Sequence, residues 1–130
     1  MIYLSGIHEL ERMIIVENTM IDAKRIEAVS ERVRQAAIET LGDRLDKVYL
    51  YDVNGGAYDG ADLSFLIVAH VTQEEASKED RKIRQRLEGV CLEHNVLYLC
   101  HVTGCEIFNK YANVIDDYKS AVEEGTLLYG

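Results

Sequence analysis

The sequence predicts an α/β (α+β) fold, a small mixed β-sheet with helices packed on it. Segments with helically spaced apolar residues alternate with short runs rich in β-branched and aromatic residues. Their order is helix, two adjacent strands, helix, strand, helices, which is typical of one layered domain. With 130 residues, of which 48% are hydrophobic, the chain is long enough to bury a core.

We divide the chain into an N-terminal extension, 1–18, and a domain, 19–130. The extension reads as a strand or a short helix. Thr19 and Asp22 have the spacing of a helix-starting capping box. Gly42 is placed to end the helix in a left-handed conformation. Between them the apolar positions form a helical stripe: Ile26, Val29, Val33, Ala36, Ala37 and Leu41.

Two strands are expected next, "KVYLYDV" at 47–53 and "DLSFLIVAHV" at 62–71, joined by the loop "NGGAYDGA" at 54–61. The second run is almost continuously apolar. Such a pattern is typical of a central strand that is covered on both faces.

Thr72 and Glu75 form a second possible capping box, which opens a long helix. Its expected buried face continues through four residues: Ile83, Leu87, Val90 and Cys91. A third strand, "VLYLCHV", follows at 96–102. Thr103 and Glu106 offer a third capping box, and Gly125 can close the last helix before the tail "TLLYG".

The net charge of −9 argues against non-specific nucleic-acid binding, which needs a basic surface. A basic protein partner would suit this charge better. Three cysteines, an odd number, argue against a disulfide framework and favour a reducing compartment. No apolar run is long enough to cross a membrane, so we expect no membrane partner and a cytoplasmic location.

From about Ile26 to Gly130 the order of elements and the motifs resemble the minimal nucleotidyltransferases of the polymerase-β-like superfamily. In that family a Gly-Ser turn ends the first strand and an Asp-x-Asp pair opens the second. Here "VYLYDV" and "ADLSFLIV" are similar to these two segments, and "VIDDYKSAVEEGTLLYG" is similar to the family's ending. Asp62 aligns with the first Asp of the pair, whereas Ser64 replaces the second.

The resemblance implies candidate catalytic residues, Asp62 and Ser64, and candidate metal ligands, Asp52 and Asp62. The candidate nucleotide-binding residues are those of the turn: Asp52, Val53, Asn54, Gly55 and Gly56. Asp52-Val53 stands where the family has Gly-Ser, so a carboxylate replaces phosphate-binding groups. Two like charges 4 Å apart repel by about 4 kcal/mol at an intermediate dielectric.

These departures predict a catalytically degenerate protein that needs no cofactor and acts by binding a protein. The resemblance implies a helical HEPN-type partner, as in toxin–antitoxin pairs, or a homodimer. The alternative is a Mg²⁺-dependent transferase that moves a nucleoside monophosphate from ATP to a protein hydroxyl. It would use Asp62, helped by Asp52 or Asp59, with Ser64 as a hydroxyl ligand or a phosphate contact in place of a carboxylate.

Three further features have two readings each, and a reactive cysteine is a fourth possibility. Five residues of zinc-ligand type lie close together, or simply pack in the core: Cys91, His94, Cys100, His101 and Cys105. A reactive cysteine with a histidine base would need an orienting acid, which no motif supplies. The basic stretch Lys78–Arg86 would contact an acidic partner or a phosphate, or be a solvated helix face. Tyr3, Tyr129 and the tail would mediate self-association, or the tail would pack on its own sheet.

Overall fold

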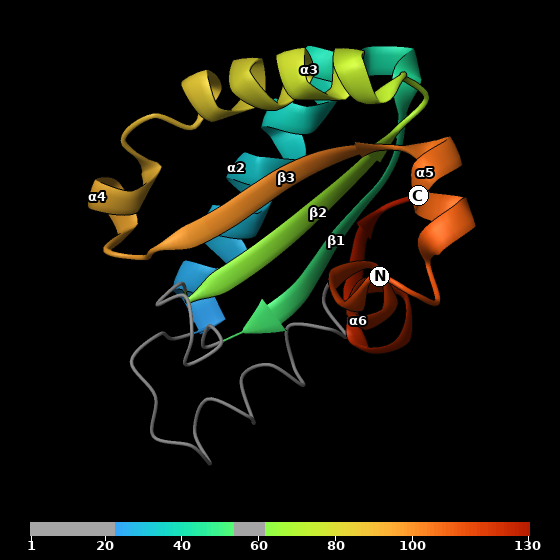
Figure 1. The fold of residues 1–130 in the computed structure, drawn as a ribbon. Helices are drawn as coiled ribbons and strands as arrows, with labels where there is room; N and C mark the ends of the chain where they lie inside the picture. Colours follow the sequence, from blue (N-terminus) through green and yellow to red (C-terminus); the bar gives the residue numbers. More distant parts are fainter. Residues whose placement is uncertain (1–22, 54–61) are drawn as a thin grey trace.

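The structure is a computed structural model, and it describes residues 23–53 and 62–130. A four-stranded mixed sheet has the strand order β3-β2-β1-β4, and helices cover it (Figure 1). This arrangement confirms the predicted fold class. The elements, in chain order, are α2 (Ala23–Leu41), the 3-10 turn η1 (Gly42–Arg44), β1 (Leu45–Val53), β2 (Leu63–Ala69), α3 (Gln73–Arg86), α4 (Val90–His94), β3 (Tyr98–Gly104), α5 (Cys105–Tyr111), α6 (Asp116–Glu124) and β4 (Thr126–Tyr129).

Helix α2 buries the apolar stripe that its sequence predicts, together with Ser30. The helix ends at Leu41, and Gly42 follows with φ +54°. The left-handed conformation expected of Gly42 is therefore confirmed. The predicted N-terminal capping box of Thr19 and Asp22 lies outside the described residues, as does the 1–18 extension.

Strand β2 is one of the two inner strands of the sheet: it pairs antiparallel with β1 and parallel with β3. All seven of its residues are buried, which confirms the prediction of a strand covered on both faces. The β1–β2 ladder has two irregularities, one between Leu45 and Lys47 and one between Leu50 and Asp52. In each of them β1 carries one extra residue.

Helix α3 begins with the predicted capping box. Thr72 Oγ1 accepts a hydrogen bond from Glu75 N–H at 3.1 Å, and Thr72 N–H donates to Glu75 Oε1 at 3.0 Å. The expectation of one long helix through Cys91 is wrong, because α3 ends at Arg86 and α4 starts at Val90. Gly89 lies between them with φ +89°, a conformation that an α-helix does not contain.

The third predicted capping box is also wrong. Thr103 belongs to β3 and is fully buried, and the residue before α5 is Gly104, which has no side chain to cap the helix. The Thr103 hydroxyl instead lies 2.7 Å from the hydroxyl of Tyr118 on α6. A buried hydroxyl needs a partner, and Tyr118 provides one across the packed layer.

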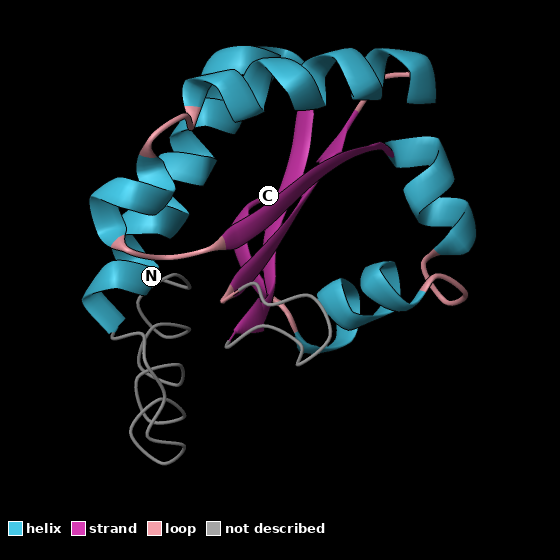
Figure 2. Ribbon diagram, turned by 60° about the vertical axis from the view of Figure 1, so that its left-hand side comes forward, coloured by secondary structure: helices cyan, strands magenta, loops and turns pink. Residues whose placement is uncertain are grey.

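Helices cover both faces of the sheet, as Figure 2 shows. On one face, α2 and α3 pack over the larger core, which includes Phe65 and Ile67 of β2. On the other face, α5 and α6 cover a smaller aromatic core with Leu66 and Val68. In this smaller core the ring of Phe108 lies 6.0 Å from that of Tyr49 and 5.3 Å from that of Tyr118.

The tail forms β4 and pairs antiparallel with β1, so Leu128 is buried. Of the two readings of the tail, the structure therefore supports packing on its own sheet, while Tyr3 lies outside the described residues. Arg34 of α2 donates a hydrogen bond to the Leu128 carbonyl at 3.1 Å. Within the described residues, none of the helices is long and apolar enough to span a membrane.

Candidate functional site

The site implied by the resemblance lies where β1 ends and β2 begins, at the lower left of the sheet in Figure 1. Asp52 is the cross-strand neighbour of Ser64, and Val53 is that of Leu63. Asp62 immediately precedes β2. Asn54, Gly55, Gly56 and Asp59 lie outside the described residues.

The Asp62 carboxylate is bound to the backbone of the neighbouring strand segment. Its Oδ2 accepts a hydrogen bond from Leu97 N–H at 3.0 Å, while Asp62 N–H donates to Leu97 O at 2.7 Å. Leu97 precedes β3, and Asp52 belongs to β1. Because β2 lies between these two strands, the Asp62 carboxylate is directed toward the side of β2 opposite to Asp52.

Ser64 and Val53 are positioned as parts of the sheet. Ser64 is only 2% exposed, and Val53 packs against the larger core. A hydroxyl at this depth has little access to a ligand in solvent. Both side chains thus contribute to packing, although the resemblance implied that these two positions contact a substrate.

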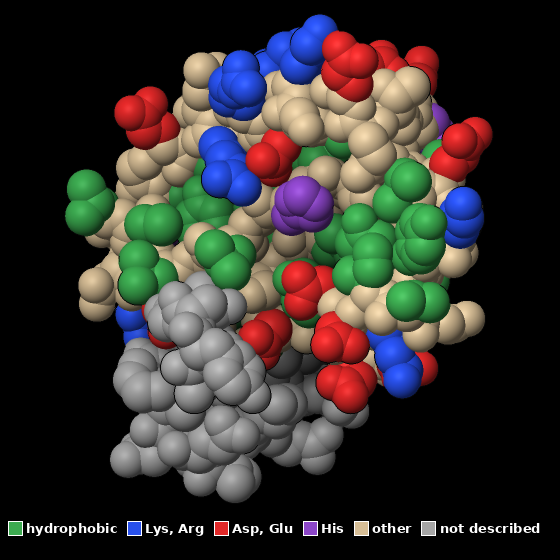
Figure 3. Space-filling model, in the orientation of Figure 1, with side chains coloured by type: hydrophobic (Ala, Val, Ile, Leu, Met, Phe, Trp, Pro, Cys, Tyr) green, Lys and Arg blue, Asp and Glu red, His purple; other side chains and the backbone are tan. Residues whose placement is uncertain are grey.

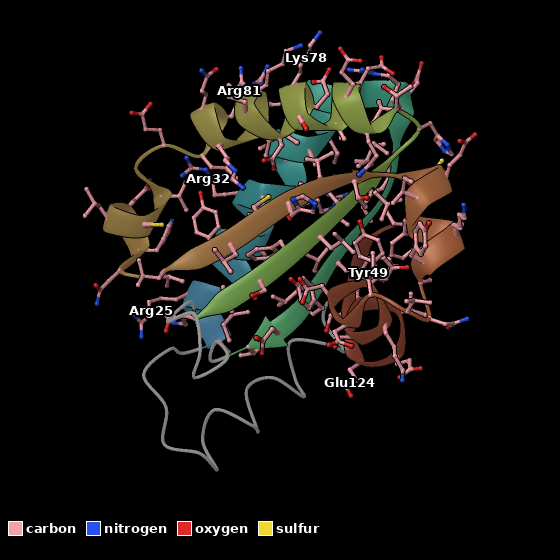
Figure 4. All side chains as sticks on the ribbon, viewed as in Figure 1. Arg25, Arg32, Tyr49, Lys78, Arg81 and Glu124 are labelled. Atoms are coloured by element: carbon pink, nitrogen blue, oxygen red, sulfur yellow. The ribbon has the colours of Figure 1, made fainter. Side chains whose placement is uncertain are left out.

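A cleft of about 360 Å³ opens beside Asp62. Leu92 and Leu97 line it, and Arg25 lies at its edge, where its guanidinium donates to Asn95 O at 3.2 Å. Figure 4 shows Arg25 at the start of α2, close to the beginning of β2. The cleft therefore combines one carboxylate, one guanidinium and exposed leucine side chains.

The described part of the chain offers no group of side chains arranged to bind a metal ion. No group of three or more His, Cys, Asp or Glu side chains that could hold a metal ion occurs there. Cys100 is buried in β3, whereas the next residue, His101, is exposed. Burial, reinforced by the charge of Asp80, raises the pKa of the Cys100 thiol to about 12. A neutral buried thiol suits core packing.

Several cations of the basic stretch on α3 form ion pairs. Lys82 lies 3.4 Å from Glu79, Arg84 lies 3.1 Å from Asp80, and Arg86 lies 3.1 Å from Glu39 of α2. Lys78 and Arg81 point away from the body of the protein (Figure 4). These pairs support the reading of a solvated helix face.

At the opposite end of the sheet the structure brings together three residues that sequence patterns did not connect. Cys105 Sγ lies 3.2 Å from His70 Nδ1. His70 Nε2 lies 3.8 Å from Asp46 Oδ1. No sequence motif supplied an acid that could orient the histidine, but in the folded protein Asp46 lies beside the His70 ring.

Strand register is the signal that predicts this meeting. Ala69 pairs with Gly104 in the parallel β2–β3 ladder and with Leu45 in the antiparallel β1–β2 ladder. His70 and Cys105 directly follow Ala69 and Gly104, and Asp46 is the extra residue next to Leu45, so the three residues lie at the same end of the sheet. The register itself depends on long-range pairing, which residue spacing does not reveal.

Comparisons with known proteins returned no match. No family model matches the chain, and neither a curated protein nor a solved structure does so.

Proposed function

We propose that this protein is a nucleotidyltransferase-like domain that does not transfer nucleotides and acts by binding another protein. The observation that carries the proposal is the hydrogen bond from Leu97 N–H to the Asp62 carboxylate. In the proposed ancestry this carboxylate would hold a metal ion. Here it fastens the start of β3 to the start of β2, so its role is structural.

The candidate residues at this site are poorly arranged to bind the metal ion that a transferase needs. Mg²⁺ prefers an octahedral set of oxygen ligands and relies on carboxylates and substrate phosphates to supply them. Asp62 is directed toward β3, Ser64 is buried, and Asp52 stands on the other neighbour of β2. An Asp52 carboxylate without a bound metal would repel the triphosphate.

The surface beside the site supports protein binding. Leu92, Leu97 and Leu99 are 90%, 59% and 48% exposed. Hydrophobic side chains gather over α4 and the start of β3 in Figure 3. We call these three residues the leucine surface. Exposed groups of large apolar side chains mark interaction sites, because their burial against a partner is favourable.

The proposed partner is a protein with a complementary apolar face. The resemblance implies either a second copy of this chain or a helical HEPN-type protein. A basic rim on the partner would complement the net charge of −9. Electrostatic attraction of this kind would act mainly on the rate of association.

Sedimentation velocity over a range from micromolar to hundreds of micromolar tests the second-copy form. We expect the wild-type protein to dimerise and the double variant Leu92→Asp/Leu97→Asp to remain monomeric. Val114→Asp is the matched control, since Val114 is 70% exposed but lies in the turn between α5 and α6. A wild-type monomer at every concentration contradicts homodimerisation, and the same variants then test binding to a HEPN-type protein.

The competing function is Mg²⁺-dependent transfer of a nucleoside monophosphate to a protein hydroxyl. One observation favours it: Asp52 and Ser64 are direct cross-strand neighbours, and Ser64 lies two residues after Asp62 in the chain. Three candidate residues thus share one end of two adjacent strands. For transfer to occur, the Asp62 carboxylate would have to leave Leu97 and turn toward β1.

A further inference from the structure

Cys105, His70 and Asp46 form a linked group at the end of the sheet where α5 begins, at the upper right of Figure 1. We call it the thiol cluster. It lies at the opposite end of β2 from Asp62, so it is independent of the proposed nucleotidyltransferase ancestry. Cys105 is partly exposed, and the side chain of His70 is 58% exposed. Small soluble molecules therefore have access to the cysteine.

The backbone holds all three residues in place. His70 N–H donates to Arg44 O at 2.7 Å, which fixes the histidine beside the start of β1. Asp46 is the extra residue of the first β1 irregularity, and a bulge of this kind re-aims the side chain that it carries. Gly104 N–H donates to Gln73 Oε1 at 2.6 Å, and this bond anchors the residue before Cys105.

Gly104 also fixes the position of Cys105 by close packing. A Cβ atom at this residue would collide with the carbonyl oxygen of Val71. Only glycine therefore allows the end of β3 to approach the β2–α3 connection so closely. Because Cys105 is the next residue, this close packing places its side chain beside the His70 ring.

The charges around His70 favour one arrangement of its protons. The Asp46 carboxylate lies beside Nε2 and attracts the proton to that nitrogen. Nδ1 is then unprotonated and can accept the thiol proton of Cys105 across 3.2 Å. Other charged groups near the cluster include Lys47, whose Nζ lies 3.5 Å from Asp46, and Glu106, which follows Cys105 in α5. Arg44, whose carbonyl accepts from His70 N–H, has its guanidinium 3.1 Å from Glu79.

We infer that Cys105 is a site of thiol–disulfide exchange with small-molecule disulfides, with His70 as its proton acceptor and Asp46 as a positioning residue. The thiol proton moves to His70 Nδ1 as Sγ attacks one sulfur of the disulfide. The S–S bond of the small molecule breaks, and a mixed disulfide forms on Cys105. His70 returns the proton to the departing thiolate, so the small molecule leaves as one reduced thiol.

The chain supplies two internal controls for this reaction. Cys91 on α4 is also partly exposed, and no contact with a histidine ring occurs for it among the described hydrogen bonds. Cys100 is buried, and burial raises the pKa of its thiol to about 12. A reaction at Cys100 would therefore indicate that the protein has unfolded. A comparison of the three thiols in one molecule separates the effect of His70 from that of exposure.

The test is the rate of mixed-disulfide formation with oxidised glutathione at neutral pH, resolved by cysteine with peptide mass spectrometry. We expect Cys105 to react about tenfold faster than Cys91, because His70 is positioned to accept the thiol proton during the attack on the disulfide. In His70→Gln, Cys105 should slow to within about threefold of Cys91, while Cys91 is unchanged. Because His70 is exposed, this variant should fold, and circular dichroism checks that it does.

Equal rates at Cys105 and Cys91 in the wild-type protein would overturn the inference, as would an undiminished Cys105 rate in His70→Gln. Asp46→Asn tests the positioning role. It should shift the pH profile of the Cys105 rate and leave the Cys91 profile in place. A Cys105 profile that is identical in Asp46→Asn and wild type would remove Asp46 from the mechanism.

Discussion

Asp62 is the residue that the proposed nucleotidyltransferase ancestry would make a metal ligand, yet its carboxylate accepts a hydrogen bond from a backbone N–H. The bond joins the segment before β2 to the segment before β3. The Leu97 carbonyl is shared between the N–H groups of Asp62 and Leu63. A substitution at Asp62 therefore removes one member of a small network that aligns the two parallel strands.

Asp62→Ala should lower the free energy of unfolding by about 1–2 kcal/mol, because it leaves Leu97 N–H without its charged acceptor. Asp62→Asn keeps an acceptor oxygen and should cost less. Urea unfolding measures both, with Glu88→Ala as the control, since Glu88 is an exposed acid between α3 and α4. An Asp62→Ala variant as stable as Glu88→Ala would contradict the structural role.

Two groups near the larger core hold their protons to unusually high pH. Burial raises the pKa of Cys100 to about 12, and burial likewise raises the pKa of Tyr98 to about 12. In the unfolded chain the usual values are 9.0 for the thiol and 10.0 for the phenol. The unfolded state therefore loses these protons first as the pH rises, and the folded state is progressively disfavoured between pH 9 and about 12.

Stability should accordingly fall on the alkaline side, and Cys100 should contribute about 1 kcal/mol of the loss between roughly pH 8 and pH 10. Urea unfolding in the presence of a reducing agent, for wild type and Cys100→Ala, measures this contribution. The variant should start less stable but fall less steeply. Cys91→Ala is the control, and a slope in Cys100→Ala equal to that of Cys91→Ala would refute the assignment.

Among single residues, the thiol cluster shows where sequence patterns stop being informative. Asp46, His70 and Cys105 are far apart in the chain and share no motif. Cys91, His94 and Cys100, which are close in the chain, do not form a site in the described structure. Which side chains meet at the end of a sheet depends on the strand register, and the local sequence does not determine that register.

The helices were predictable where a local signal dominates. The stripe on α2 and the capping box on α3 depend on contacts three or four residues apart, and both are present. The break between α3 and α4 was missed because Leu87 and Val90 continue the helical spacing across Gly89. Thr103 was misassigned because a threonine before a helix also suits a buried strand end.

The capping box of α3 gives a prediction for this helix. Thr72→Ala should lower the free energy of unfolding by about 1 kcal/mol, because Glu75 N–H loses its acceptor. Glu75→Gln should also destabilise the protein, since the hydrogen bonds from Thr72 lower the pKa of Glu75 and so favour its charged form. Glu74→Gln, one residue away in the same turn, is the matched control and should have little effect; thermal unfolding measures all three.

In the whole molecule, the order of the strands was the least predictable property. The sequence indicated β1, β2 and β3, but both the strand formed by the tail and its place beside β1, at the far edge from β3, came only from the structure. Asp62 precedes β2 and His70 of the thiol cluster follows it, so the two sites lie at opposite ends of this strand. The two sites can therefore be tested separately, and neither result depends on the other.

The proposed loss of nucleotide transfer is tested most directly by calorimetric titration of the wild-type protein with ATP, in the presence of Mg²⁺ or Mn²⁺. We expect no saturable heat up to millimolar ATP, and the same result for Asp62→Asn. Micromolar binding that requires the metal ion and disappears in Asp62→Asn would contradict the proposal. It would indicate that the Asp62 carboxylate leaves Leu97 to hold a metal, and it would favour the competing transferase function.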